Sequence, residues 1–163
     1  MNALSRITEI MVTVVLLFLI PLFYMVCQQD YMMQVYIQEQ VIYFVDSVRN
    51  VGYLNMGMYE GFEKKLAMSG HTFEIEMSYY EKKYEMETEN LYYTGYYTDD
   101  LKEAIYERDT KTFVMHQGDS FMVKVENKDA TLAARLFHMV TCRKLPFQTL
   151  CARYGGMIRS ECI

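Results

Sequence analysis

Residues that could carry out catalysis are scattered along this 163-residue sequence and form no known catalytic motif. The sequence contains none of the common motifs for zinc sites (HExxH), phosphate sites (GxxxxGKS or GxxxxGKT), dinucleotide sites (GxGxxG) or serine nucleophiles (GxSxG). The histidines, His71, His116 and His138, lie too far apart for any two to have metal-ligand spacing. We interpret each as an ordinary surface or core residue and expect a protein that is not an enzyme and has no metal or cofactor.

Cysteine chemistry is limited to one candidate pair. The four cysteines, Cys27, Cys142, Cys151 and Cys162, are too few and too irregularly spaced for a disulfide framework, and no CxxC occurs. Cys142 and Cys151 bracket a short loop that contains Pro146. In the extracellular location argued below, this pair would face an oxidising environment, so a disulfide and two free thiols are both open alternatives.

Tyrosine is the most conspicuous residue type, with fifteen copies and no tryptophan. Several of them fall in the acidic run 80–97, which shows neither a strand nor a helix period and is predicted to be a long surface loop. Tyr92, Tyr93, Tyr96 and Tyr97 could stack on, or hydrogen-bond to, a glycan or a partner protein. The alternative is that about half of the tyrosines pack in a core and the others stabilise the charged loop.

The charge balance argues against nucleic-acid binding. The chain has 21 acidic and 16 basic side chains, a net charge of -5, and its lysines and arginines are dispersed. A protein that binds the phosphate backbone needs a clustered basic surface, which is missing here.

One segment predicts a membrane helix. Residues 10–29 contain no charged side chain, and at 1.5 Å per residue they would span about 30 Å, the thickness of a bilayer core. A cleaved secretory signal has a shorter apolar stretch, and no small-x-small cleavage site follows Val26. Arg6 is the basic side chain that precedes the segment, so the positive-inside rule places the N-terminus in the cytoplasm and the C-terminal part outside.

The helix is expected to continue beyond the membrane. Apolar residues recur every three to four positions after Asp30, which predicts one helix from Ile7 to near Val51, with Gly52 as its stop. Pro21 removes one backbone hydrogen bond and should bend the apolar half. The bend is either a plain structural kink or a feature that aligns the helix with neighbours in an assembly.

Further elements follow this helix. Asn55 is the expected N-cap of a second helix that ends at Ser69-Gly70. Residues 71–80 alternate between apolar and polar side chains and predict a half-buried strand. Asp100 and Glu103 resemble a capping box that opens a short helix through Ile105.

The C-terminal third predicts more strands. Residues 111–117 and 120–126 flank Gly118-Asp119 and are expected to form a hairpin. Asp129 or Thr131 would cap a helix through Val140. An extended segment from Phe147 to about Tyr154 then reaches Gly155-Gly156, where we expect a bulge or bend.

These expectations define an α+β fold, in which a long N-terminal transmembrane-to-amphipathic helix packs on a small, mostly antiparallel β-sheet with short extra helices. The predicted parts are a cytoplasmic N-terminus at 1–9, a transmembrane helix at 10–29, its amphipathic continuation at 30–52, and an extracytoplasmic α+β domain at 53–163.

This plan resembles that of the type IV pilins and pseudopilins. The shared features are a carboxylate at the start of an apolar helix (Thr8-Glu9-Ile10), a proline kink, an amphipathic continuation of the helix and a small sheet. The stretches VDSVRNVGYLNMGMYEGFEKKLAMSGHTFEIEM, GDSFMVKVEN and ARYGGMIR more specifically resemble pilin-like proteins of Gram-positive tight-adherence (Tad) pilus systems. The resemblance implies a minor, non-catalytic subunit of a surface pilus or secretion apparatus. Its partners would be the lipid bilayer, other pilin-like subunits in a homo- or hetero-oligomer, and the assembly machinery.

The resemblance also implies assembly roles for Arg6, Glu9 and Pro21. A prepilin peptidase cut after Leu4 would make Glu9 the fifth residue and a cut after Ala3 would make it the sixth, while an uncleaved anchor is the third alternative. Glu9 either pairs locally with Arg6 or meets the N-terminal amine or Arg6 of a neighbouring subunit.

Two rival functions remain open. One is a membrane-anchored extracellular adhesion or ligand-binding module that uses the tyrosine-rich loop. The other is a membrane-anchored enzyme of unrecognised class.

Overall fold

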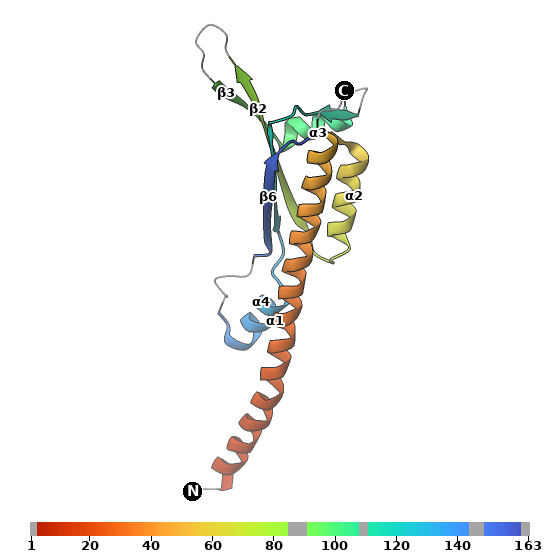
Figure 1. The fold of residues 1–163 in the computed structure, drawn as a ribbon. Helices are drawn as coiled ribbons and strands as arrows, with labels where there is room; N and C mark the ends of the chain where they lie inside the picture. Colours follow the sequence, from red (N-terminus) through yellow and green to blue (C-terminus); the bar gives the residue numbers. More distant parts are fainter. Residues whose placement is uncertain (1–2, 85–90, 108–110, 144–148, 161–163) are drawn as a thin grey trace. The chain divides into compact units, whose positions relative to one another are not determined.

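The computed structural model of the chain describes residues 3–84, 91–107, 111–143 and 149–160. The elements follow one another as α1 (Ala3–Val51), β1 (Tyr53–Asn55), α2 (Met56–Ala67), β2 (Phe73–Tyr84), β3 (Leu91–Tyr97), α3 (Thr98–Tyr106), β4 (Thr112–Val114), β5 (Ser120–Asn127), α4 (Leu132–Thr141) and β6 (Cys151–Met157) (Figure 1). The fold is α+β, as predicted. The chain divides into two compact units, one of residues 1–33 with 130–149 and the other of residues 34–129 with 150–163.

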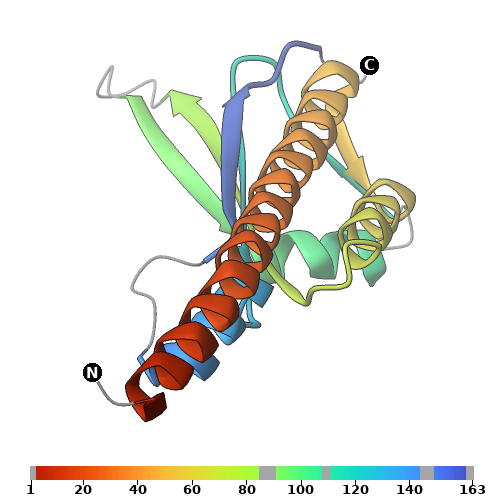
Figure 2. The same cartoon turned by 90° about the horizontal axis from the view of Figure 1, so that it is seen from below.

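The long first helix is confirmed. α1 runs for 49 residues with Pro21 inside it, and its ribbon is continuous (Figure 2). Gly52 ends it, because its φ of 74° is left-handed and its N–H donates to Val48 O at 2.9 Å. The helix therefore begins near the N-terminus and ends where the sequence predicts.

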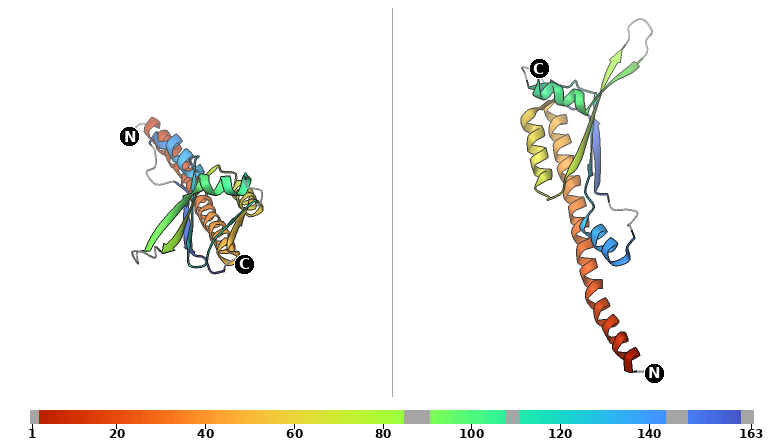
Figure 3. Two further views of the ribbon diagram at one scale, coloured as in Figure 1. Left: turned by 90° about the horizontal axis from the view of Figure 1, so that it is seen from above. Right: turned by 180° about the vertical axis from the view of Figure 1, so that it is seen from behind.

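The second unit is built on a four-stranded antiparallel sheet with the order β3-β2-β5-β6. The second half of α1 and α2 lie on one face of this sheet (Figure 3). The buried side chains of α1 recur at helical spacing: Ile37, Val41, Phe44, Val45 and Val48. The ring of Phe44 stacks on that of Phe62 from α2 at 4.3 Å and lies 6.3 Å from that of Phe121 on β5. Helix and sheet thus share one core.

The two predicted caps are confirmed. Asn55 Oδ1 accepts a hydrogen bond from the N–H of Met58 at 2.8 Å and opens α2. Thr131 Oγ1 accepts from the N–H of Ala134 at 3.4 Å and opens α4, so Thr131 rather than Asp129 is the N-cap. Both side chains satisfy backbone donors that the first helical turn leaves free.

The predicted loop at residues 80–97 is wrong. β2 continues to Tyr84 and pairs antiparallel with β3, in a register from Ser78 opposite Tyr97 to Tyr84 opposite Leu91. Both faces of this two-stranded extension carry polar and aromatic side chains, so it lacks the apolar alternation of a half-buried strand. Residues 85–90, between the two strands, lie outside the described residues.

The predicted hairpin of residues 111–117 and 120–126 is also wrong. β4 pairs with β1 in a separate two-stranded sheet, whereas β5 pairs with β2 and β6. Gly118 does turn the chain with a φ of 91°, but its N–H donates to Ile158 O at 3.1 Å and Asp119 O accepts from the N–H of Ile158 at 2.7 Å. These bonds to the segment after β6 separate the two strands.

Two smaller predictions need correction. Asp100 is the third residue of α3 rather than its N-cap, and its carboxylate accepts from the N–H of Tyr97 at 2.9 Å. Gly155 and Gly156 form no bulge, because they pair in register with Met122 and Phe121 within β6. The start of that strand was predicted at 147, which lies outside the described residues; β6 begins at Cys151.

The first unit contains the apolar part of α1 and the helix α4, which lies beside it (Figure 2). The ring of Phe137 on α4 is 6.2 Å from that of Phe23 on α1. The carboxylate of Asp30 accepts from the N–H of Ala133 at 3.3 Å, at the first turn of α4. An aromatic contact and a side-chain cap therefore hold α4 against α1.

Candidate functional site

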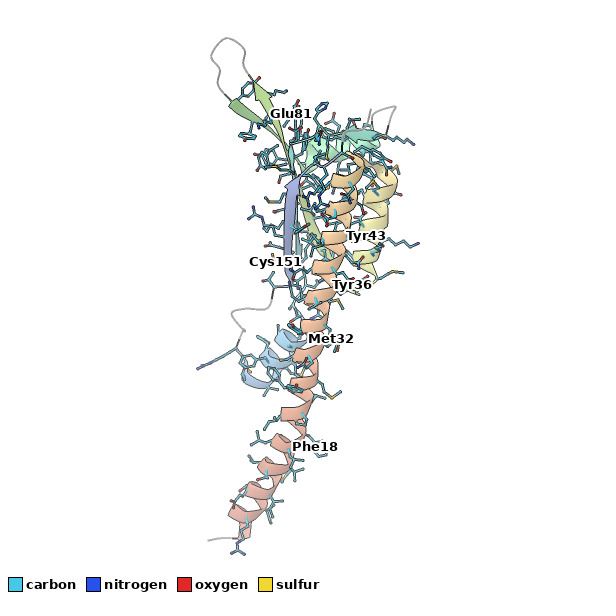
Figure 4. All side chains as sticks on the ribbon, in the orientation of Figure 1. Phe18, Met32, Tyr36, Tyr43, Glu81 and Cys151 are labelled. Carbon is cyan, nitrogen blue, oxygen red and sulfur yellow. The ribbon has the colours of Figure 1, made fainter. Side chains whose placement is uncertain are left out.

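The apolar half of α1 exposes most of its side chains. Within the described residues, none of its most apolar eighteen-residue window is buried, and the helix is long and apolar enough to cross a membrane. Leu17, Phe18 and Ile20 are 68%, 70% and 66% exposed, and Figure 4 shows Phe18 pointing away from the helix. Soluble monomers rarely expose contiguous apolar patches of more than a few hundred Å². The segment is therefore compatible with a membrane-spanning helix.

Arg6 and Glu9 lie one turn apart before this surface, and both side chains are exposed. Among the residues that the structure describes, neither forms an ion pair. The backbone carbonyl of Glu9 accepts from Thr13 Oγ1 at 2.8 Å, but its carboxylate is open to solvent. The local pairing of Glu9 with Arg6 is therefore not formed in the single chain, and Pro21 lies further along the same exposed segment.

The four tyrosines singled out from the sequence lie on two opposite faces of the β2–β3 hairpin, which projects beyond α3 (Figure 1). Directly opposed residues of an antiparallel pair share a face. Tyr96 lies opposite Tyr79 with the rings 5.8 Å apart, and Tyr92 lies two pairs further along the same face. Tyr93 and Tyr97 lie on the other face. The four residues do not form a single surface.

The inner face of the hairpin belongs to the core. The ring of Tyr96 lies 5.6 Å from that of Phe113, and its hydroxyl donates to Glu81 Oε2 at 3.1 Å. Glu81, labelled in Figure 4, also pairs with Lys83 Nζ at 3.0 Å. Tyr96 is thus mainly structural.

The outer face of the hairpin carries an exposed aromatic surface, which we call the tyrosine face and define as Tyr80, Tyr93 and Tyr97. Tyr93 and Tyr97 are 60% and 59% exposed. A Cβ on Gly95 would lie 3.4 Å from Tyr97 Oη and 3.5 Å from Tyr80 Cε1, so both rings lean over this glycine. The sequence prediction missed Tyr80. Its alternation with Tyr79 and Glu81 along a strand was the signal for it.

A shallow depression continues from the tyrosine face over the sheet. Its volume is about 520 Å³, and Ser78, Tyr97, Met122, Lys124 and Arg153 are among its lining residues. Lys124 is held by Glu76 at 3.3 Å and Glu126 at 3.0 Å. The outer face of the sheet therefore offers aromatic, cationic and hydroxyl groups to solvent.

A buried polar network fixes the base of the hairpin. Asp119 is 3% exposed, and its carboxylate accepts hydrogen bonds from the hydroxyl of Tyr79 and, at 2.8 Å, from the N–H of Lys82. The hydroxyl of Tyr79 also accepts from the N–H of His116 at 3.4 Å. Burial, and then the hydrogen bond to Asp119, raise the pKa of Tyr79 well above its usual range. These hydrogen bonds continue to join β2 to the chain before β5 at the point where the β2–β5 ladder ends.

Two side chains of α1 tie the outer edge of β6 to the helix. Gln34 donates to the carbonyl of Cys151 at 2.6 Å and accepts from its N–H at 3.1 Å. Arg49, only 9% exposed, donates to Met157 O at 2.8 Å and pairs with Asp46 at 2.7 Å. Both ends of this edge are thereby paired.

The candidate cysteine pair had two open alternatives, a disulfide or two free thiols. In the structure Cys142 and Cys151 are free thiols. Cys142 is the exposed C-cap of α4, whereas the thiol of Cys151 lies 3.5 Å from Glu126 on the neighbouring strand. Among the described residues, no three histidine, cysteine or acidic side chains are grouped as metal ligands would be.

Comparison with protein-family models, with curated proteins and with solved structures found no match to this chain.

Proposed function

We propose that this chain is a minor, non-catalytic, pilin-like subunit of a bacterial surface pilus or related secretion apparatus, and that it assembles through its N-terminal helix. The observation that carries the proposal is α1 itself. One uninterrupted helix joins a largely exposed apolar segment to a second half whose buried side chains form part of the core of an α+β domain. A subunit that is first held in a bilayer and then packed against like helices needs such an element.

The exposed apolar surface suits both the subunit held in the bilayer and the subunit packed in an assembly. Residues 10–29 are long enough for a bilayer core, which would cover the helix before assembly. Neighbouring apolar helices could cover the same side chains afterwards, since helix packing replaces lipid contacts without a large hydrophobic cost. In this proposal the N-terminus is cytoplasmic and residues 53–163 are extracellular, as the position of Arg6 favours.

The open carboxylate of Glu9 supports an interaction between subunits. A charge at the edge of an apolar helix is stabilised by a partner, and Arg6 does not supply one within the chain. We propose that Glu9 meets the N-terminal amine or Arg6 of a neighbouring subunit and so sets the axial register between helices. Pro21 would align the apolar segments by bending them.

The test compares Glu9→Gln with Glu39→Gln in cells that produce the filament. Both variants remove one carboxylate charge from an exposed position of α1, but Glu39 lies beyond the apolar run. We expect both chains to reach wild-type levels in the membrane, with Glu9→Gln alone depleted from sheared surface filaments. Equal recovery of the two variants in the filaments would refute the assembly role.

The tyrosine face supports a second candidate function, an extracellular adhesion or binding module. Tyr80, Tyr93 and Tyr97 present stacking surfaces beside a depression with exposed polar groups. Tyr93→Ser should then reduce attachment of cells to the partner, whereas Tyr92→Ser on the opposite face should not. Unchanged attachment in the Tyr93 variant would exclude this surface.

A further inference from the structure

α4 presents a wide apolar stripe beside the side of the helix that contacts α1. The stripe consists of residues at positions i, i+4, i+7 and i+8 of the helix: Leu132, Leu136, Met139 and Val140. Leu132, Met139 and Val140 are 44%, 77% and 55% exposed. Phe137, next to the stripe, makes the ring contact with Phe23. Most of the apolar stripe is therefore open to the surroundings of the chain.

The contacts of α4 fix its level along α1. Asp30, which caps the first turn of α4, is the first charged residue after the uncharged run. Phe23, which contacts Phe137, lies seven positions earlier in the same helix, or about 10 Å along its axis at 1.5 Å per residue. α4 thus lies between the first charge and the interior of the apolar run. If that run crosses a bilayer, α4 lies at its outer boundary.

The charges of α4 fit this location. Arg135 borders the apolar stripe beside Met139, His138 lies further round on the polar side of the helix, and Arg143 follows its C-terminus; all three are exposed. The nearby carboxylate of Asp30 is engaged as the cap of Ala133. An apolar stripe with cations along its polar side is typical of helices that lie in the membrane interface and attract anionic lipids.

We propose that α4 is an interfacial helix, which inserts the apolar stripe into the outer boundary of the bilayer beside α1 and places Arg135 and Arg143 among anionic lipid headgroups. This inference rests on the membrane anchoring of α1 in the proposed function. It adds a second membrane contact that would fix the rotation and depth of the anchor.

The experiment uses the full chain with its native cysteines replaced by serine, reconstituted in vesicles of phosphatidylcholine and phosphatidylglycerol. An environment-sensitive fluorophore is attached to one introduced cysteine at a time: Met139→Cys on the stripe, Leu17→Cys on the apolar run, or Glu103→Cys on the exposed side of α3. We expect nitroxide-labelled acyl chains to quench the first two labels and aqueous iodide to quench the third. Vesicles of phosphatidylcholine alone should reduce lipid quenching at Met139 but not at Leu17.

The outcomes separate this inference from the function on which it rests. Iodide quenching at Met139 as strong as at Glu103, with Leu17 quenched by lipid, would overturn the inference and leave the anchor intact. Protection of Met139 from both quenchers, lost on dilution with lipid, would show that a second copy covers the stripe and would also overturn it. A lack of lipid quenching at Leu17 would overturn the anchor itself. Lipid quenching at Met139 that is independent of phosphatidylglycerol would overturn the role of Arg135 and Arg143.

Discussion

Replacement of Asp119 by alanine should loosen the β2–β3 hairpin at its base. The side chain is 3% exposed and satisfies two donors, the hydroxyl of Tyr79 and the N–H of Lys82. Asp119→Ala leaves both donors without this acceptor in a buried site. Hydrogen bonds to charged groups contribute about 1.5 to 3 kcal/mol each, so we expect a loss of about 3 to 5 kcal/mol in the free energy of unfolding.

Two related variants divide this loss between its causes. Asp119→Asn keeps an oxygen for the N–H of Lys82 but leaves the hydroxyl hydrogen of Tyr79 without this acceptor. It should therefore cost about 1.5 to 3 kcal/mol, the contribution of one hydrogen bond to a charged group. Asp129→Ala removes an exposed carboxylate and, as the control, should change stability by less than about 0.5 kcal/mol.

The assay measures unfolding and local opening separately. Urea titration of the full chain in detergent micelles, followed by near-ultraviolet circular dichroism, reports the packing of the tyrosines and is not masked by tryptophan. Hydrogen exchange of the segment around Lys82 should accelerate about 10- to 100-fold in Asp119→Ala, as expected for the loss of one charge-assisted bond. Wild-type stability together with unchanged exchange at Lys82 would refute the role assigned to this carboxylate.

Three further predictions follow from the same unit and from the thiols. Gly156→Ala places a Cβ 2.7 Å from the buried guanidinium of Arg49 and should lower the free energy of unfolding in urea by about 1 to 3 kcal/mol. As the control, Gly61→Ala meets nothing within 4 Å and should stabilise α2 by about 0.5 to 1 kcal/mol. Equal effects of the two variants would contradict the packing described. The fold raises the pKa of Tyr79 above the usual 10.0, so the unfolded chain loses this proton at lower pH than the folded chain. The free energy of unfolding should therefore fall above about pH 10, by up to 1.4 kcal/mol per pH unit. An equally steep fall in Tyr79→Phe would contradict this assignment. Maleimide should label Cys142 faster than Cys151, whose pKa is raised by burial and by Glu126, and mass spectrometry of unreduced protein should find both thiols free; a linked pair would contradict the structure.

The long helix and the helix caps could be predicted because their signals are local. An unbroken three-to-four spacing of apolar residues continues as far as Val48, and Gly52 follows as a residue that readily adopts a left-handed φ. Asn55 and Thr131 precede helical segments with side chains that accept from the first turn. No distant contact is needed to recognise any of these features.

The errors arise where tertiary contacts override local pattern. Gly118-Asp119 has the chemistry of a hairpin turn, but the bonds to Ile158 direct β4 and β5 to different sheets. Gly155 and Gly156 pair regularly within β6. Glycine is needed there because Phe121 O and the guanidinium of Arg49 occupy the space a Cβ would need. Neither neighbour can be identified from sequence spacing.

The site was predicted only in part for the same reason. Alternation along β3 assigns Tyr93 and Tyr97 to one face and Tyr92 and Tyr96 to the other once the segment is known to be a strand. The register with β2 places Tyr80 opposite Gly95 and so adds Tyr80 to the tyrosine face. The exposed apolar run needs no register, since every face of that helix is apolar. It could therefore be identified from the sequence alone.

The central claim is that α1 anchors the chain across a membrane with residues 53–163 outside. The most direct measurement is protease treatment of intact protoplasts that carry the full chain with one epitope before Met1 and another after Ile163. The account predicts loss of the C-terminal epitope, while the N-terminal epitope survives on a fragment that contains the apolar part of α1. Protection of both epitopes until the membrane is permeabilised would contradict it.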